Sequence, residues 1–274
     1  MSFITKKDLA IGPQFGSQMG QYAGLYAVSK MTGHEIVFLD ECMRVGHGVK
    51  LFDAFDLKDK IIDGRNIKFN DYSPKDIPFD TSVFNISKDE NWNFGGCFHT
   101  YNYWHDYRED LLKIYTFKPH IVKQAEEYLS KIRHPEFPTI SLHFRRTDYL
   151  KVSSLNLSNS YYNDAMKTIC DQLNAYSYTI LIFSDDIKWC KANLGGENVF
   201  YSENNSNYVD MCMMSMCDHN IIANSTFSWW GAYLNQNKNK KVVCPMQYIG
   251  PSDIHHQFIN RNYYPKEWIA LDVF

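Results

Sequence analysis

The sequence lacks long apolar runs and paired cysteine motifs. No segment approaches the roughly 18 consecutive apolar residues that a membrane-spanning helix needs, and Met1–Gly12 has no signal-peptide pattern. The seven cysteines are scattered without a C-x-x-C pair. Such spacing is typical of small, buried, reduced thiols rather than of a disulfide framework or a zinc site. These absences predict a cytoplasmic protein, and they leave peripheral contact with the inner face of a membrane open.

The chain also has little excess charge. Its 28 Lys and Arg residues nearly balance 31 Asp and Glu residues, for a formal net charge of -3. A nucleic-acid partner is therefore not predicted, and any phosphate binding must come from a local site. With 274 residues, of which 45% are hydrophobic, the chain has enough apolar material for one large or two small domains.

The first part of the chain has the pattern of a β-α-β unit. A short strand is predicted to end at residues 8–11, followed by a glycine-bearing turn at 12–16 and a helix over 18–31. Gly33 is placed to end that helix, and residues 35–39 form the next predicted strand. No G-x-G-x-x-G follows the first strand, which argues against a nicotinamide-dependent Rossmann enzyme.

The middle of the chain is harder to assign. Turn-forming residues interrupt the short apolar runs of residues 45–100, and helices are predicted over 103–115 and 121–132. The prolines of the segment R-H-P-E-F-P then mark the predicted domain boundary. We therefore expect an amino-terminal lobe over 1–135 and a carboxyl-terminal lobe over 136–274.

The second lobe alternates apolar strands with helices. Strands are predicted at 139–144, 178–183, 199–201, 219–223 and 241–244, and helices at 161–173, 186–192, 208–216 and 227–235. This alternation indicates a doubly wound α/β fold with a parallel sheet. Ligands of such sheets bind at the carboxyl ends of the strands.

Three polar segments follow strands of this lobe. The first is H-F-R-R-T-D-Y, from His143 to Tyr149. Adjacent arginines at a strand end need a partner, and the planar guanidinium fork suits a diphosphate. The alternative is a pair of surface ion pairs with nearby carboxylates.

The second segment is F-S-D-D, in which Asp185 and Asp186 follow a buried strand. These carboxylates could accept N–H donors of a nucleotide base, or cap the next helix. The spacing is not D-x-D, so no metal site is predicted.

The third segment, A-N-S-T-F-S-W-W-G, runs from strand into helix. Backbone N–H groups and hydroxyls at a helix amino terminus can bind phosphate. Ordinary helix capping is the alternative.

In this order the three segments resemble the alpha-1,2-fucosyltransferases of glycosyltransferase family 11. H-x-R-R-x-D is the best-known motif of that family. The stretches Gly12–Ala23 and Gly96–His99 also resemble family elements, so the resemblance spans nearly the whole chain.

The resemblance implies a GT-B-like fold, with two Rossmann-type lobes and a cleft between them. It also implies an inverting transferase that moves L-fucose from GDP-fucose to the 2-hydroxyl of a galactoside, without cofactor or metal. An oligosaccharide acceptor, possibly lipid-linked as in O-antigen synthesis, would be the second substrate. The residues expected to bind the GDP-sugar are His143, Arg145, Arg146, Asp185, Asn224, Ser225, Thr226 and Phe227.

The amino-terminal loop departs from the family pattern. The family usually has Gly-Asn-Gln where this chain has Gly16, Ser17 and Gln18. We expect this loop to face the donor sugar or the acceptor. Because serine lacks the amide donors of asparagine, another GDP-linked deoxyhexose remains an alternative to fucose.

The expected catalytic residues are Arg145 and Asp148. Arg145 stabilises the charge that develops on the leaving diphosphate. Asp148 is a candidate base for the acceptor hydroxyl, or it orients Arg145 by an ion pair. Further candidate bases near the first β-α unit are His34, Asp40 and Glu41. A catalytically inactive glycan- or nucleotide-binding homologue is the remaining alternative, although the intact motifs argue against it.

Overall fold

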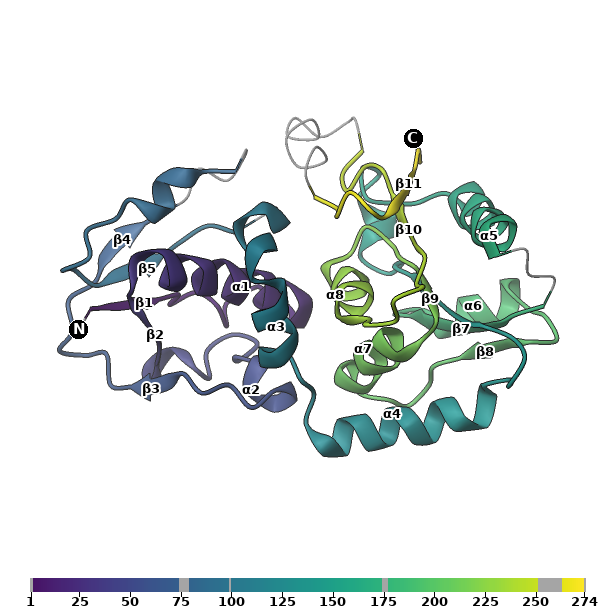
Figure 1. Ribbon diagram of the computed structural model, residues 1–274, viewed down its shortest axis with the longest axis horizontal. Helices are drawn as coiled ribbons and strands as arrows, with labels where there is room; N and C mark the ends of the chain where they lie inside the picture. The colour runs from purple at the N-terminus through teal and green to yellow at the C-terminus, as the bar shows by residue number, and fades with distance from the viewer. Residues whose placement is uncertain (1, 74–78, 99, 174–176, 251–262, 274) are drawn as a thin grey trace. The chain divides into compact units, whose positions relative to one another are not determined.

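The structure is a computed structural model that describes residues 2–73, 79–98, 100–173, 177–250 and 263–273. The chain divides into two compact α/β units, Met1–Thr116 and Phe117–Phe274 (Figure 1). In the described ranges every strand pairing is parallel, as predicted. The predicted boundary at residue 135 is wrong, because the helix α4 (Pro119–Ile132) packs against a helix of the second unit, α7 (Asn207–Met216).

The first unit is built on a sheet with the strand order β3-β2-β1-β5-β4. Its strands are β1 (Phe3–Thr5), β2 (Glu35–Leu39), β3 (Lys60–Ile62), β4 (Asn70–Tyr72) and β5 (Trp92–Phe94). Its α-helices are α1 (Phe15–Thr32), α2 (Leu51–Ala54) and α3 (Arg108–Ile114). Short 3-10 helices are η1 (Asp40–Cys42), η2 (Thr81–Phe84), η3 (Tyr101–Tyr103) and η4 (His105–Tyr107).

Helix α1 is buried on most of its surface. Gly33 ends it in the left-handed conformation, with φ 83°, and donates its N–H to the Ser29 carbonyl oxygen, which confirms the predicted cap. Gly24 permits close packing inside the unit. A Cβ at Gly24 would lie 2.2 Å from the ring of Phe98, so only glycine lets this ring rest on the helix.

Two predictions in this unit are wrong. The first strand ends at Thr5, not at residues 8–11, and the next residue, Lys6, is buried. Its ammonium group donates to the carbonyl oxygens of Phe94 and Gly96, at 3.3 and 2.6 Å, which ties the chain after β1 to the end of β5. The helix predicted over 103–115 is split into η3, η4 and α3, because the ring of Tyr103 packs against other aromatic rings of the unit.

The second unit has the strand order β11-β10-β9-β6-β7-β8. Its strands are β6 (Thr139–Phe144), β7 (Thr179–Ser184), β8 (Val199–Tyr201), β9 (His219–Ile221), β10 (Val242–Pro245) and β11 (Ile269–Leu271). Besides α4 and α7, its helices are α5 (Asn159–Leu173), α6 (Ile187–Asn193), α8 (Thr226–Leu234) and the 3-10 helix η5 (Tyr149–Lys151). All the predicted strands and helices of this half are present with small shifts at their ends, and β11 is an additional strand.

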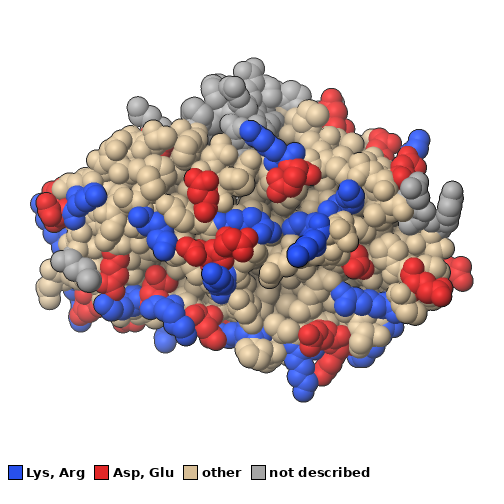
Figure 2. Space-filling view, in the orientation of Figure 1, with Lys and Arg blue, Asp and Glu red and all other residues tan. Residues whose placement is uncertain are grey.

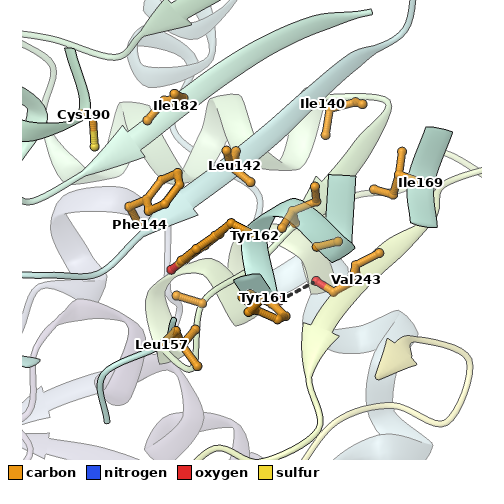
Figure 3. Packing of buried hydrophobic residues seen from close by; sticks show 13 residues of the cluster. Ile140, Leu142, Phe144, Leu157, Tyr161, Tyr162, Ile169, Ile182, Cys190 and Val243 are labelled. Carbon is orange, nitrogen blue, oxygen red and sulfur yellow. Dashed lines mark hydrogen bonds between the residues drawn. The ribbon is translucent and has the colours of Figure 1, made fainter. Parts of the chain in front are cut away.

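One hydrophobic cluster of this unit lies between the sheet and α5. Figure 3 shows Phe144 and Ile182 of neighbouring strands with Tyr161 and Tyr162 of α5. The rings of Phe144 and Tyr162 stack with centroids 3.9 Å apart, and the Tyr161 hydroxyl donates to the Ile222 carbonyl oxygen at 2.6 Å. This packing fixes the last residue of β6, and therefore the position from which the polar segment after it begins.

Candidate functional site

The candidate site lies at the carboxyl edge of the sheet in the second unit. β6 is a central strand, with β7 on one side and β9 on the other. The three polar segments follow these three strands, so the parallel sheet brings them to one edge, as predicted. Figure 2 shows positive and negative side chains interspersed over the visible face, without a broad area of one sign.

His143 is the last inward-facing polar residue of β6. Its side chain is buried, and its Nδ1 lies 2.9 Å from Oγ of Ser228 in the first turn of α8. Burial, together with the nearby charge of Arg145, lowers the pKa of His143 to about 3. The imidazole is therefore neutral at neutral pH, and it links β6 to α8.

Arg145 is held by two carboxylates. Its Nη2 lies 2.8 Å from Oδ1 of Asp148, and its Nη1 lies 3.2 Å from Oδ2 of Asp185. About a third of its side chain, 31%, remains accessible. A guanidinium that is both oriented and accessible can bind an anion without a large change in conformation.

Arg146 has different partners. Its guanidinium carbon lies 3.4 Å from the ring centroid of Trp189, and its Nε lies 3.4 Å from Oδ2 of Asp186. The Asp186 side chain also accepts the Trp189 N–H and so caps α6. The structure thus separates the two adjacent arginines: Arg145 is presented at the strand edge, whereas Arg146 holds α6.

Asp185 accepts hydrogen bonds mainly from the H-F-R-R-T-D-Y segment itself. Its Oδ1 accepts the Arg146 backbone N–H at 2.9 Å, and its Oδ2 accepts the Thr147 hydroxyl. Together with the ion pair to Arg145, these contacts make Asp185 an organiser of the turn after β6. The predicted contact of Asp185 with a nucleotide base stays a prediction.

Asp148 is paired with Arg145 at the surface. Partial burial raises its pKa, but the hydrogen bond from Arg145 and the positive charge outweigh this effect, so the pKa of Asp148 lies below its usual value. A carboxylate that holds its negative charge so firmly is a poor proton acceptor. Of its two predicted roles, the structure favours orientation of Arg145.

Asn224 lies at the turn between β9 and α8 and is fully buried. Its Nδ2 donates to the carbonyl oxygens of Leu155 and Tyr248, both at 2.9 Å, and so joins two loops around the site. The backbone carbonyl oxygen of Asn224 accepts a hydrogen bond from the Tyr149 hydroxyl at 3.2 Å. Asn224 is therefore placed to position the loops, and its predicted direct contact with the donor would require these bonds to change.

The next three residues form the amino terminus of α8. Ser225 is the N-cap, and its Oγ accepts the Phe227 N–H at 3.4 Å. Thr226 and Phe227 are half-buried, and the ring of Phe227 lies 5.7 Å from that of His143. The helix begins beside the end of β6, where its N–H groups and hydroxyls could receive a phosphate.

A further carboxylate at the same edge escaped the sequence analysis. Ser202 directly follows β8 and donates its N–H to the Ile182 carbonyl oxygen, while its hydroxyl donates to Oδ1 of Asp210 at 2.5 Å. Burial raises the pKa of Asp210 to about 6. In the sequence this carboxylate is marked only by its position, as a single acidic residue between Val209 and Met211 in a mainly apolar stretch of helix.

The predicted donor-sugar or acceptor loop of the first unit is arranged differently from the prediction. Gly16 and Gln18 are buried and Ser17 is half-buried. The Gln18 amide is 0% exposed and is bonded entirely to backbone groups of two loops. The start of α1 turns the Gln18 side chain inward, so its predicted contact with a substrate stays a prediction and would require these bonds to change.

The candidate bases of this unit lie at opposite ends of β2. His34 is buried at the amino end of β2, with Nδ1 2.7 Å from Oγ1 of Thr32 and Nε2 3.0 Å from the Glu90 carbonyl oxygen. It is thus a structural residue and not a base at the strand edge. Asp40 and Glu41 are exposed at the carboxyl end of β2.

In the part of the chain that the structure describes, no group of three or more His, Cys, Asp or Glu side chains is arranged to hold a metal ion. No described helix is both long and apolar enough to span a membrane.

Several glycosyltransferases are similar to this chain in sequence. WbnK, an O-antigen biosynthesis glycosyltransferase of Escherichia coli, is 40% identical over 120 residues, which cover 40% of this chain and 39% of the relative. An alpha-1,2-colitosyltransferase of Escherichia coli is 29% identical over 189 residues, which cover 65% of this chain and 62% of that relative. The galactoside 2-alpha-L-fucosyltransferase SEC1 of Bos taurus is 24% identical over 237 residues, which cover 81% of this chain and 62% of that relative. The matched regions thus span less than two thirds of these relatives' own lengths.

Solved structures share the fold. POFUT1 in complex with GDP-fucose superposes with a TM-score of 0.58 at 12% identity, covering 89% of this chain and 97% of that one. The fucosyltransferase NodZ from Bradyrhizobium superposes with a TM-score of 0.54 at 14% identity, covering 84% and 92%. The predicted GT-B-like class, with two mainly parallel α/β units, is confirmed. Residues 2–272 match the model of glycosyl transferase family 11, and the chain therefore belongs to that family.

Proposed function

We propose that this chain is an inverting glycosyltransferase that transfers L-fucose from GDP-fucose to the 2-hydroxyl of a galactoside. The supporting observation is the oriented and accessible guanidinium of Arg145, which lies at the same sheet edge as the amino terminus of α8. In glycosyl transfer the leaving diphosphate gains negative charge in the transition state. A fixed guanidinium and helix N–H groups would stabilise that charge without reorganisation.

The guanine base needs an acceptor for its N–H groups. Asp185 follows β7, and Asp210 lies in the first turn of α7, beside Ser202 at the end of β8. Asp185 is already bonded to three groups of the turn after β6. Burial raises the pKa of Asp210 although the Ser202 hydroxyl donates to it, which means that this single hydrogen bond only partly replaces the lost solvation of the carboxylate. A base that donates N–H groups to Asp210 would stabilise the carboxylate further. We therefore favour Asp210 over Asp185 for the guanine contact.

A second donor is supported by one relative. The alpha-1,2-colitosyltransferase of Escherichia coli matches 65% of this chain, and Ser17 departs from the usual family loop. A transferase of another GDP-linked deoxyhexose is thus the alternative, with the same nucleotide site and a different donor sugar.

The name of WbnK supports a role in O-antigen synthesis. The acceptor would then be an oligosaccharide carried on a lipid, and the enzyme would act in the cytoplasm, at the inner face of the membrane. We propose that transfer needs no metal ion, since the guanidinium and the helix amino terminus supply the positive field for the diphosphate.

The test is a product assay with the purified chain, GDP-fucose and a panel of galactosides, run with EDTA and then with Mg²⁺. We expect a fucosylated product with inverted anomeric configuration, at equal rates in both buffers. A 2-deoxygalactoside acceptor serves as the matched control and should give no product.

Three results would count against parts of the proposal. Transfer only from another GDP-deoxyhexose would move the donor to the alternative. If the chain binds GDP but releases none from GDP-fucose with any acceptor, the result would support an inactive homologue. Loss of activity in EDTA that Mg²⁺ restores would refute metal independence.

A further inference from the structure

The segment that follows β10 contacts both sides of the candidate donor site in the second unit. Asn224 Nδ2, directly before the N-cap of α8, donates to the Tyr248 carbonyl oxygen at 2.9 Å. The Gly250 N–H donates to the Ser154 carbonyl oxygen at 2.6 Å, in the loop that follows η5. We call residues 246–250 the β10 loop. It belongs to none of the three polar segments that the sequence analysis identified.

The side chain of Tyr248 reaches the turn that carries Arg145. Its hydroxyl is hydrogen bonded to the hydroxyl of Tyr149. Because Tyr149 donates its single proton to the Asn224 carbonyl oxygen, its own oxygen is left to accept the proton of Tyr248. The ring of Tyr149 lies 5.3 Å from the guanidinium carbon of Arg145. One side chain therefore connects Tyr248 to the guanidinium.

A third tyrosine contacts Tyr248 from the carboxyl-terminal part of the chain. The rings of Tyr248 and Tyr263 have centroids 4.1 Å apart, and their hydroxyls are hydrogen bonded to each other. The Tyr263 carbonyl oxygen accepts the indole N–H of Trp229, a residue of α8, at 3.1 Å. We call Tyr149, Tyr248 and Tyr263 the tyrosine chain. Both of its ends are bonded to α8 or to the residue before its N-cap.

The tyrosine chain keeps its hydrogen bonds near neutral pH. Burial raises the pKa of Tyr149 and of Tyr248 above the usual range of a phenol, so both hydroxyls stay protonated. A network of buried hydrogen bonds restricts the positions of all its members. It therefore limits the movement of the Tyr149 ring and of the guanidinium beside that ring. A charged group that is already in place stabilises a transition state without reorganisation.

We propose that Tyr248 is a positioning residue of the transferase, which acts through Tyr149 to hold the Arg145 guanidinium where the departing diphosphate gains charge. The inference rests on the proposed function. In this role Tyr248 contacts no reacting atom. Loss of its hydroxyl frees the Tyr149 ring, so that the guanidinium has to be oriented during the reaction, which lowers kcat.

The first test compares Tyr248→Phe with the wild-type chain. The variant keeps the ring beside Tyr263 and loses only the hydroxyl. We expect kcat and the affinity for GDP each to fall by about two- to ten-fold, with little change in melting temperature. Tyr178→Phe is the matched control, because it removes a hydroxyl that is bonded to Cys170 directly before β7, at the opposite edge of the same sheet. The control should bind GDP and transfer normally.

The second test shows whether Tyr248 acts through Arg145. In an Arg145→Ala background, Tyr248→Phe should cause no further loss of kcat or of GDP affinity, because residues that act as one unit are not additive. The same is expected in a Tyr149→Phe background. A tyrosine that only stabilises the fold would lower the melting temperature in every background and would leave kcat unchanged wherever the variants are folded.

The inference is overturned if Tyr248→Phe binds GDP and transfers like the wild-type chain, or if its effect persists undiminished in the Arg145→Ala background. Failure of the proposed function gives a different result, because the wild-type chain then forms no fucosylated product. The comparison of GDP affinities still decides the role of Tyr248 in that case, and a wild-type chain that binds no GDP refutes both.

Discussion

The ring of Tyr149 supports the guanidinium of Arg145, with the guanidinium carbon 5.3 Å from the ring centroid. The hydroxyl of the same tyrosine donates to the Asn224 carbonyl oxygen at 3.2 Å, directly before the N-cap of α8. Burial raises the pKa of Tyr149 above its usual range, so the hydroxyl stays protonated and remains a donor. Tyr149 therefore connects the two elements that we assign to the diphosphate, the turn after β6 and the start of α8.

Tyr149 can be divided into its two functions by substitution. Tyr149→Phe keeps the ring and loses a hydrogen bond worth about 0.5–1.5 kcal/mol, so GDP affinity should fall by about two- to ten-fold. Tyr149→Leu also loses a cation–π contact of about 0.5–1 kcal/mol and should bind GDP more weakly still. Calorimetric titration measures both, and equal affinity for GDP in all three proteins would show that Tyr149 does not connect the two elements.

The adjacent arginines should respond oppositely to removal. Arg145→Ala removes the charge that stabilises the leaving group, and we expect kcat to fall by about 100- to 1000-fold with little change in melting temperature. Arg146→Ala loses the stacking on Trp189 and the ion pair with Asp186. It should mainly lower the melting temperature. Steady-state kinetics and thermal unfolding of the two variants test this division, which fails if Arg145→Ala turns over normally.

Asp148 is expected to act through Arg145. Since its pKa is lowered in the folded chain, its ion pair stabilises the fold at neutral pH and is lost as the pH falls through that lowered value. Asp148→Asn should remove this acid-dependent part of the stability and reduce turnover by about ten-fold or less. A general base would cost about 100-fold or more. Urea unfolding between pH 7 and pH 3, together with kinetics at pH 7, distinguishes the two roles.

Asp210 is expected to lower the stability of the fold and to strengthen nucleotide binding. Its pKa of about 6 lies above the usual value, so the buried carboxylate destabilises the fold progressively as the pH rises from about 4 to about 6, and the cost persists at pH 7. Asp210→Asn should therefore raise the stability at pH 7, by roughly 1–3 kcal/mol, and weaken GDP binding while leaving weak ADP binding unchanged.

Asp185→Asn is the comparison for this experiment. Its carboxylate organises the turn after β6, so the variant should weaken the binding of GDP and ADP alike. The assignment of guanine to Asp210 is contradicted if Asp185→Asn alone removes the preference for GDP.

The sequence was most informative where local pattern decides structure. Strands β2, β6 and β8 have the predicted bounds, since a short apolar run between turn signals admits few alternatives. The strands between residues 45 and 100 were not assigned because β3 and β4 are short and half-exposed, with charged or amide residues among them. The boundary was misplaced because prolines mark a turn, whereas the packing of α4 on α7 decides to which unit the helix belongs.

The sequence by itself determined the family motifs, the alternation of strands and helices, and the meeting of three polar segments at one sheet edge. These follow from periodicity and from the rule that parallel strands end on the same side. Only the tertiary structure decided that Arg145 is accessible while Arg146 holds α6, that the Gln18 side chain is buried between two loops, and that Asp210 joins the edge from a helix. Each of these depends on partners distant in sequence or on the direction in which a side chain leaves its element, and neither is encoded in a local pattern.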